Sequence, residues 1–345
     1  MKVSLFDYEL PEGAIAQEPT PDRGQSRLLV LSRADGSLQH RVFCDLPQLL
    51  QPGDALVLNN TQVIPARLFG HKRGGRARIE MLLLEDLGEQ RWKVLAQRAR
   101  RLRPGAEIDI DSHVTATVEE ELGDGQFAVR FTLHGNWMEL LSRVGRVPLP
   151  PYIRRPAGRD HARDRERYQT VFARVPGSAA APTAGLHFSP EILSALTRRG
   201  VRLVEITLHV GLDTFRPVLT EEMEDHVIHS ERYEVSEEAV AALSETRAAG
   251  GRIVAVGTTT TRALETVVDE EGVFHPSAGR TRLYILPGRR FCGVDAMLTN
   301  FHLPRTTLLA MVAAFAGRER VLAAYRAAIA AGYRFYSYGD AMLIV

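Results

Sequence analysis

Residues 253–262 read Ile-Val-Ala-Val-Gly-Thr-Thr-Thr-Thr-Arg, and this stretch decides the fold class. Its four apolar residues predict a short buried strand, and Gly257 marks the end of that strand. The hydroxyl side chains that follow are typical of a helix start, so a helix is expected over residues 260–268. A strand that leads through a glycine into a helix is the repeating unit of an α/β fold.

The rest of the chain continues this alternation. Ser189 and Pro190 predict a helix start, Gly200 predicts its end, and residues 201–208 are expected to form the next strand. Further expected elements are a helix over residues 236–250 and strands over residues 56–58 and 283–286. The pattern therefore predicts an α/β domain with a mixed or mostly parallel sheet.

Residues 61–135 have a different sequence pattern, in which short segments of apolar or of alternating apolar and polar residues lie between glycine-rich turns. The expected strands are residues 79–84, 92–96, 114–118 and 127–133. Strands at this spacing predict a small antiparallel barrel or sandwich. We expect a β-barrel domain at residues 61–149, inserted into a discontinuous α/β domain made of residues 1–60 and 150–345.

The composition is that of an ordinary globular protein. The 345 residues are 45% hydrophobic and 25% charged, with a formal net charge of +1. Cys44 and Cys292 cannot build a disulfide framework or a zinc knuckle. No apolar run reaches the length of a membrane span, and the amino terminus lacks the apolar stretch of a signal peptide, so we expect a cytoplasmic protein.

Basic residues cluster even though the net charge is small. The clusters are residues 71–78, 98–103 and 154–167. The last of these alternates Arg with Asp and Glu and shows no apolar face, so we expect an exposed basic loop there. A nearly neutral protein with such patches is suited to binding a polyanion locally.

Five polar segments lie where predicted strands end, which is where α/β enzymes place their sites. They are residues 58–61, 177–188, 208–215 with 226–231, 255–262, and 298–307 with 336–340. Each has a plain alternative: an Asn-rich turn, a flexible linker, helix caps or packed aromatic residues. Residues 257–261 could cradle a carboxylate or phosphate, although they match neither a Walker loop nor a Rossmann fingerprint.

Four side chains of the third segment could be metal ligands. His226 and His229 are three positions apart, with Glu231 and His209 nearby in the sequence. Zinc sites prefer defined helical or knuckle spacings, and none is evident here. Hydrogen-bonding or acid–base histidines are therefore favoured over a metal site.

Together with residues 7–11, 15–17 and 26–29, these segments resemble the S-adenosylmethionine:tRNA ribosyltransferase-isomerase family of queuosine biosynthesis. The resemblance runs nearly end to end. It implies a mixed α/β domain interrupted by a small β-barrel. It also implies transfer of the ribosyl part of S-adenosylmethionine to 7-aminomethyl-7-deazaguanine at the wobble position of tRNA with a G-U-N anticodon. The product is epoxyqueuosine, and adenine and methionine leave.

The resemblance and the residue types together give the expected site, with S-adenosylmethionine as co-substrate, no metal and a monomeric protein. The expected catalytic residues are His187, His209, Glu231, His302 and Asp340. The expected S-adenosylmethionine contacts are Pro182, Thr183, Ala184, Gly185, Gly257, Thr258, Thr259 and Arg262. The expected tRNA contacts are Asn59, Asn60, Arg67, Arg154, Arg155, Arg159 and Arg305.

Several positions depart from the pattern usual in that family. Gln62 stands where Arg is usual, Ile228 where Met is usual, and Arg305 where Lys is usual. Thr260 and Thr306 replace Ser. Asp213 stands where Gly is usual, and a carboxylate beside His209 could change the charge state of that histidine.

The family chemistry requires a base that is neutral near pH 7, and histidine meets this requirement. His187 is the first candidate and His209 the second, because both end segments of small residues that a ligand can approach. Glu231 and Asp340 could orient a histidine or assist the departure of adenine. Two other classes of function stay open from the residues alone: a catalytically inert tRNA-binding module and a metal-dependent hydrolase.

Overall fold

The computed structural model describes residues 1–75, 77–97, 102–133, 135–155, 162–211 and 217–345. The chain divides into two compact units. Unit 1 comprises Met1–Gln62, Pro150–Arg155 and Arg167–Val345, and unit 2 comprises Val63–Leu149 and Pro156–Glu166. Among the described residues, no helix has both the length and the apolar character needed to cross a membrane.

Unit 1 is built on a nine-stranded sheet with the order β15-β13-β12-β3-β14-β16-β17-β1-β2. The strands are β1 Arg27–Leu31, β2 Leu38–Val42, β3 Ala55–Asn59, β12 Arg202–Leu208, β13 Glu231–Val235, β14 Ile253–Val256, β15 Ser277–Thr281, β16 Ala296–Asn300 and β17 Ala341–Ile344. The central strands β12, β3, β14 and β16 are mutually parallel, whereas β13, β15, β17 and β2 each pair antiparallel with a neighbour. The predicted mixed α/β sheet is confirmed.

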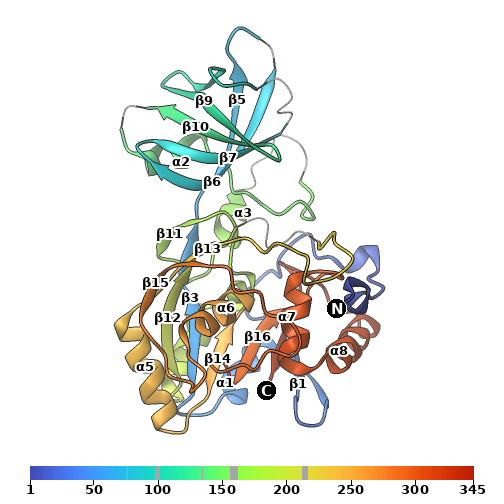
Figure 1. Ribbon diagram of the computed structural model, residues 1–345. Coiled ribbons are helices and arrows are strands. Elements are labelled where there is room, and N and C mark those ends of the chain that lie inside the picture. Colours follow the sequence, from blue (N-terminus) through green and yellow to red (C-terminus); the bar gives the residue numbers. More distant parts are fainter. Residues whose placement is uncertain (76, 98–101, 134, 156–161, 212–216) are drawn as a thin grey trace. The chain divides into compact units, whose positions relative to one another are not determined.

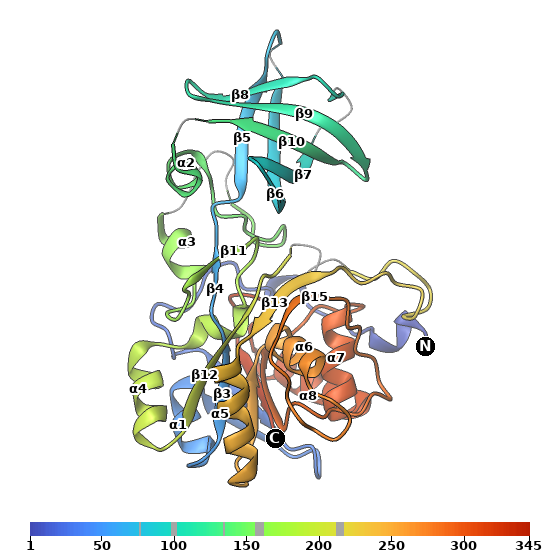
Figure 2. The same cartoon turned by 60° about the vertical axis from the view of Figure 1, so that its left-hand side comes forward.

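Helices cover both faces of this sheet (Figures 1 and 2). They are α1 Leu46–Leu49, α4 Pro190–Arg198, α5 Glu237–Ala248, α6 Thr258–Val267, α7 Thr307–Ala316 and α8 Arg318–Ala330. Alternate residues of a strand point to opposite faces. Leu56 and Leu58 accordingly pack in the cluster that contains side chains of α1 and α4, while Val57 packs in the cluster of α5 to α8.

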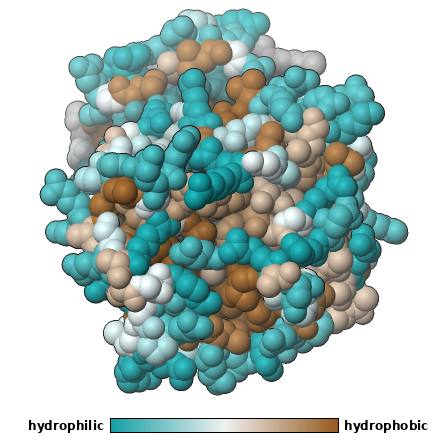
Figure 3. Space-filling view, turned by 60° about the horizontal axis from the view of Figure 1, so that its bottom comes forward, coloured by the Kyte–Doolittle hydropathy of each residue, from teal (hydrophilic) through white to brown (hydrophobic). Residues whose placement is uncertain are grey.

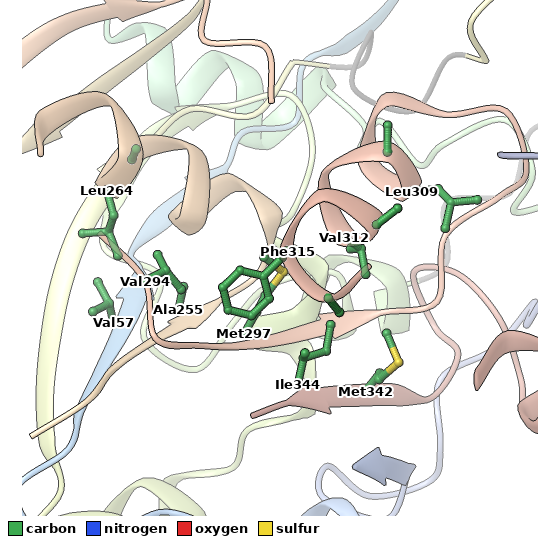
Figure 4. Packing of buried hydrophobic residues seen from close by; sticks show 14 of the residues in the cluster. Val57, Ala255, Leu264, Val294, Met297, Leu309, Val312, Phe315, Met342 and Ile344 are labelled. Carbon is green, nitrogen blue, oxygen red and sulfur yellow. The ribbon is translucent and has the colours of Figure 1, made fainter. Parts of the chain in front are cut away.

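The larger of these clusters forms the main core. In Figure 4, Val312 and Phe315 of α7 lie over Met297 of β16, and Leu264 of α6 lies near Val57. Each fully buried side chain of this kind stabilises the fold by about 1.5–3 kcal/mol relative to exposure. Outside the core, the face drawn in Figure 3 is mostly hydrophilic, with smaller apolar patches between the polar residues.

Local signals explain where the helices begin. Ser189, Ser236 and Thr306 accept hydrogen bonds from the backbone at the starts of α4, α5 and α7. The strand expected over residues 283–286 is wrong, because β15, at Ser277–Thr281, takes the edge position beside β13. Residues 277–281 are polar and pair with β13 through their backbone. The apolar residues that follow, including Tyr284 and Leu286, pack against the main core instead of forming a strand.

Unit 2 contains the closed barrel β10-β7-β6-β5-β8-β9, in which every pairing is antiparallel. The strands are β5 Arg67–Lys72, β6 Arg78–Gly88, β7 Arg91–Gln97, β8 Glu107–Asp111, β9 Val114–Gly123 and β10 Gln126–Thr132. Helix α2, Trp137–Val144, follows the last strand, and Trp137 stacks on Trp92 with ring centroids 5.4 Å apart. The expected inserted β-barrel is confirmed as part of the fold (Figure 2).

The shorter elements complete the chain. They are η1 Val3–Phe6, η2 Glu12–Ala14, η3 Phe43–Asp45, β4 Thr61–Val63, α3 Ala162–Arg167, β11 Val175–Ser178 and η5 Thr183–His187. Strands β4 and β11 form a separate two-stranded sheet. Residues 162–167 form helix α3 within the segment that we expected to be a basic loop, whereas residues 156–161, with Arg159, lie outside the described residues.

Candidate active site

The site lies at the carboxyl ends of the central strands of unit 1. Strands β3, β14 and β16 end at Asn59, Val256 and Asn300, and their parallel arrangement brings these ends to one edge of the sheet. A recess opens there, which we call the first recess. Its lining includes Pro182, Thr183, Ala184, Gly257, Thr258, Thr259, Asn300 and His302. Three segments that are far apart in the sequence thus meet in one recess, including the two that we expected to face each other, residues 182–187 and 257–261.

The amino terminus of α6 forms one wall of the first recess. Gly257 has a φ of +92°, a conformation that side chains other than glycine adopt only with strain. The first intrahelical bond runs from the Thr261 N–H to the Gly257 carbonyl, so the N–H groups of Thr258, Thr259 and Thr260 precede it. Because Gly257 supplies no side-chain cap, these N–H groups and the helix dipole can bind an anion.

The short helix η5 forms the facing wall. Thr183 donates a hydrogen bond of 2.9 Å to the Asn300 Oδ1 atom, which ties η5 to the end of β16. Gly185 lies behind the recess rather than in its lining. A Cβ atom there would approach Phe172 and Thr170 to 2.8 Å, so this glycine permits close packing.

His187, our first candidate for the base, is buried behind the lining of the first recess. Its Nδ1 lies 2.7 Å from the Ser26 hydroxyl, and its Nε2 lies 3.1 Å from the Asn300 amide nitrogen. Burial, with Arg334 and Arg23 nearby, lowers the pKa of His187 to about 3. With both ring nitrogens occupied, this histidine is arranged to hold Asn300 rather than to accept a proton from a ligand.

His302 lines the first recess directly. Its Nε2 lies 2.8 Å from the Thr299 hydroxyl. Burial lowers the pKa of His302 to about 3, so the ring is neutral near pH 7 but is a weak base. Its position suits a hydrogen-bonding role towards a ligand.

His209 follows the end of β12 and is half-buried. Its Nδ1 lies 2.8 Å from the Thr61 hydroxyl, which itself donates to the Ser178 hydroxyl at 2.9 Å. Because Thr61 has only one hydrogen to give, His209 must donate through Nδ1, and Nε2 is then the unprotonated nitrogen. Burial and Arg232 lower the pKa of His209. Asp213, which could alter this histidine, lies outside the described residues.

Gly177 makes room for the His209 ring. A Cβ atom at this position would lie 2.7 Å from the ring carbon Cε1. The sequence showed a run of small residues here but not their purpose. Gly177 and Ser178 lie in the predicted segment 177–188, and Thr61 lies in the segment 58–61, but nothing in the sequence gave any of them a role beside His209.

A second recess shares Thr258 and Thr259 with the first. It contains a buried ion pair in which Arg262 donates to Glu231 over 2.7 Å. The same guanidinium donates to the backbone oxygens of His229 and Leu283. Arg262 was expected to add positive charge for S-adenosylmethionine, but its charge is compensated by Glu231.

The histidines of the metal interpretation do not form a ligand cluster. His226 and His229 line the second recess with Glu231, whereas His209 does not line it. Within the described ranges, no three side chains of the His, Cys, Asp or Glu type gather in a metal-binding group.

Three predicted site residues have structural partners. Asp340 is buried and accepts hydrogen bonds of 2.8 Å from the backbone N–H groups of Arg27 and Arg334. Asn59 exchanges two hydrogen bonds with the backbone of Leu208, and Asn60 accepts one from the Thr207 hydroxyl. These bonds join the end of β3 to β12. Asn59 and Asn60 are only 1% and 5% exposed, so their side chains are not accessible to an RNA at the surface.

The basic side chains that we expected to contact tRNA differ in their exposure and in their pairing with carboxylates. The Arg154 side chain is 80% exposed, and its nearest carboxylate, Glu12, is 3.5 Å away. Arg155 is largely covered and bonds to Glu18 and the Gln17 carbonyl. The remaining described basic candidates, one in each unit, are Arg305, paired with Asp7, and Arg67, 3.2 Å from Glu80.

The queuosine biosynthesis protein family model matches residues 3–344 of the chain. The chain belongs to this family. Curated relatives named S-adenosylmethionine:tRNA ribosyltransferase-isomerase include those of Pelotomaculum thermopropionicum, 52% identical, and Moorella thermoacetica, 51% identical, each with full coverage of both chains. The solved S-adenosylmethionine tRNA ribosyltransferase of Thermotoga maritima is 40% identical, with a TM-score of 0.57 over 99% of this chain and 100% of that one.

Membership in the queuosine biosynthesis protein family agrees with the resemblance that the sequence motifs indicated. The relatives match along the whole chain, so both the α/β unit and the inserted barrel are common to this group.

Proposed function

We propose that this member of the family transfers the ribosyl part of S-adenosylmethionine to 7-aminomethyl-7-deazaguanine at the wobble position of tRNA and isomerises it to the epoxycyclopentane of epoxyqueuosine. Adenine and methionine are released. The observation that carries the proposal is the first recess, where the amino terminus of α6, the η5 turn and His302 converge. The names and full-length identity of the relatives support it.

S-adenosylmethionine is assigned to the first recess. Its carboxylate suits the N–H groups at the start of α6, where the helix dipole favours a negative charge. Thr183 and Asn300 offer polar contacts on the opposite wall, held in place by His187. These residues come from separate elements of one unit, which gives the cavity a fixed shape.

His209 is assigned as the base. The sulfonium makes the neighbouring ribose 5′-hydrogens acidic, so a neutral histidine near the ribose can remove one of them. His209 does not itself line the first recess, but the next residue, Val210, does. His209 has an unprotonated Nε2, whereas His187 uses both nitrogens and His302 is weakened as a base by full burial. In this assignment His187 and His302 position other groups, and no metal takes part.

The tRNA is assigned to basic side chains, and the foremost of them is Arg154, whose side chain is 80% exposed. The other candidates are Arg155, Arg159, Arg305 and Arg67. The tRNA is the isoacceptor group with a G-U-N anticodon, and the enzyme acts as a monomer in the cytoplasm. Phosphate contacts of this type position RNA without reading its sequence.

The test incubates the protein with S-adenosylmethionine and tRNA carrying 7-aminomethyl-7-deazaguanine. We expect adenine and methionine to appear together with the modified tRNA, and full activity after exhaustive chelation. A tRNA with guanine at the wobble position is the matched control and should release no adenine. Binding of tRNA without adenine release would favour the inert module, and zinc-restored activity would favour metal chemistry. Neither alternative is favoured by the family membership.

A further inference from the structure

Tyr336 lines the first recess with a strained backbone. Its φ is +74°, in the left-handed region that a bulky side chain rarely adopts. Two hydrogen bonds hold it there: its N–H donates to the Phe301 carbonyl at 3.1 Å, and its own carbonyl accepts from the Gly339 N–H at 2.9 Å. Strain of this kind persists only where the surroundings enforce it, and it gathers at functional sites. The Tyr336 carbonyl therefore has a fixed direction.

This carbonyl fixes the orientation of the Asn300 side-chain amide. The Asn300 Nδ2 lies 3.2 Å from the Tyr336 carbonyl oxygen and 3.1 Å from His187 Nε2. Only the NH2 end of an amide can donate to a carbonyl, so the amide cannot be flipped here. Since an NH2 group donates and does not accept, His187 Nε2 must be the unprotonated nitrogen. The Nδ1 of His187 then carries the hydrogen and donates to the Ser26 hydroxyl at 2.7 Å.

The same orientation decides what Thr183 can offer a ligand. Asn300 presents its Oδ1 to the Thr183 hydroxyl, which must donate its one hydrogen there, over 2.9 Å. This hydroxyl has no other partner in the described part of the chain. Its lone pairs remain, and Thr183 lines the first recess. Thr183 can therefore accept a hydrogen bond from a ligand but cannot donate one.

None of the described side chains that line the first recess is charged near pH 7. The polar ones are hydroxyls, the Asn300 amide and His302, which is neutral because burial lowers its pKa to about 3. An amino-acid head group is zwitterionic, so it brings its own compensating charge. Such a group needs N–H donors for its carboxylate and oxygen acceptors for its ammonium. The start of α6 supplies the donors, and Thr183 supplies an acceptor.

We propose that the Thr183 hydroxyl accepts a hydrogen bond from the α-ammonium of S-adenosylmethionine and thereby selects the amino-acid end of this substrate. The inference rests on the proposed function, which assigns the neighbouring carboxylate to the start of α6. The ammonium and the carboxylate are attached to one carbon atom, so the two walls of the recess must lie close together. A Cβ atom at Gly257 would lie 3.6 Å from the Ala184 Cβ, which meets this requirement.

The experiment pairs a change in the protein with a change in the ligand. Wild type and Thr183→Val are compared, at saturating tRNA substrate, with S-adenosylmethionine and with the analogue that carries hydrogen in place of the α-ammonium. With the natural ligand, we expect Thr183→Val to lower kcat/KM for adenine release about 10- to 100-fold, the usual value of a hydrogen bond to a charged group. With the analogue, the two proteins should have equal kcat/KM, because the interaction is already absent.

Thr183→Ser is the matched control, because it keeps the hydroxyl and should retain most of the wild-type kcat/KM with the natural ligand. Valine also leaves the Asn300 Oδ1 without its donor. Any effect of that loss on the shape of the recess would lower kcat/KM for both ligands alike, so the comparison of the two ligands separates it from the ammonium contact.

Equal losses for the two ligands, or no loss in Thr183→Val, would overturn the assignment of Thr183 alone, because adenine release by wild type would still support the proposed function. No adenine release by wild type from S-adenosylmethionine and the tRNA would refute the proposed function, and this inference with it.

Discussion

Two ion pairs, one in each unit of the protein, differ in how far they are buried. In unit 1, Arg262 and Glu231 form an ion pair whose side chains are 7% and 4% exposed. In the barrel of unit 2, Arg130 and Arg91 share Glu119, but their side chains are 43% and 36% exposed. Desolvating a charge is costly, so the buried pair depends on its partner far more than the exposed pair does. The two pairs should therefore respond differently when one cation is removed.

Removal of one cation from each unit gives the largest expected difference. Arg262→Ala leaves Glu231 as a buried carboxylate without its partner and should lower the free energy of unfolding by about 3–5 kcal/mol. Arg130→Ala leaves Glu119 near water and still paired with Arg91, so the loss should stay below about 1 kcal/mol. Urea unfolding of the two variants measures both values. Equal losses would remove the contrast between the units.

The buried histidines make stability depend on pH. His187 and His302 have folded pKa values of about 3, below the unfolded value of about 6.5. Between these values the unfolded chain binds protons that the folded chain does not, so stability is full above the unfolded pKa and is lost as the pH falls. Each histidine should contribute a slope of about 1.4 kcal/mol per pH unit in this window.

The check is the slope difference between wild type and His302→Gln. The variant should show a free energy of unfolding that depends less steeply on pH between 6 and 4. A His302→Gln protein with the wild-type slope would mean that His302 is not kept neutral by burial.

The smallest expected effect concerns RNA binding at the surface of unit 1. Arg154 is exposed and loosely paired, so Arg154→Ala should lower the log–log salt slope of tRNA binding by about one. Arg155→Ala should change it less, because Arg155 is covered and bonded to Glu18 and to the Gln17 carbonyl. Fluorescence anisotropy at several salt concentrations measures both slopes. A larger change for Arg155 would reverse the assignment of the phosphate contact.

Strand and helix positions followed closely from local signals in the sequence. The strand at residues 253–256 and the cap at Ser189 are local features, and both were predicted. The edge strand was missed because residues 277–281 are polar and pair only through their backbone. Pairing between distant segments cannot be predicted from the side chains of one segment alone.

The site was predicted by segment but not by role. The small residues before His187 and the glycine before α6 do meet in one cavity. The roles depend on distant partners: His187 is occupied by Ser26 and Asn300, and Arg262 by Glu231. A histidine's motif does not show which of its nitrogens is already bonded, so the order of the candidate bases could not be settled from the sequence.

Exchange of the 5′-hydrogens of S-adenosylmethionine with deuterated water reports which residue removes the proton. We expect wild type to catalyse this exchange and His209→Ala to slow it by about 10²–10⁴-fold while S-adenosylmethionine still binds. His187→Ala is the matched comparison and should keep measurable exchange, because His187 acts through Asn300. Wild-type exchange in His209→Ala, with exchange lost in His187→Ala, would contradict the assignment of the base.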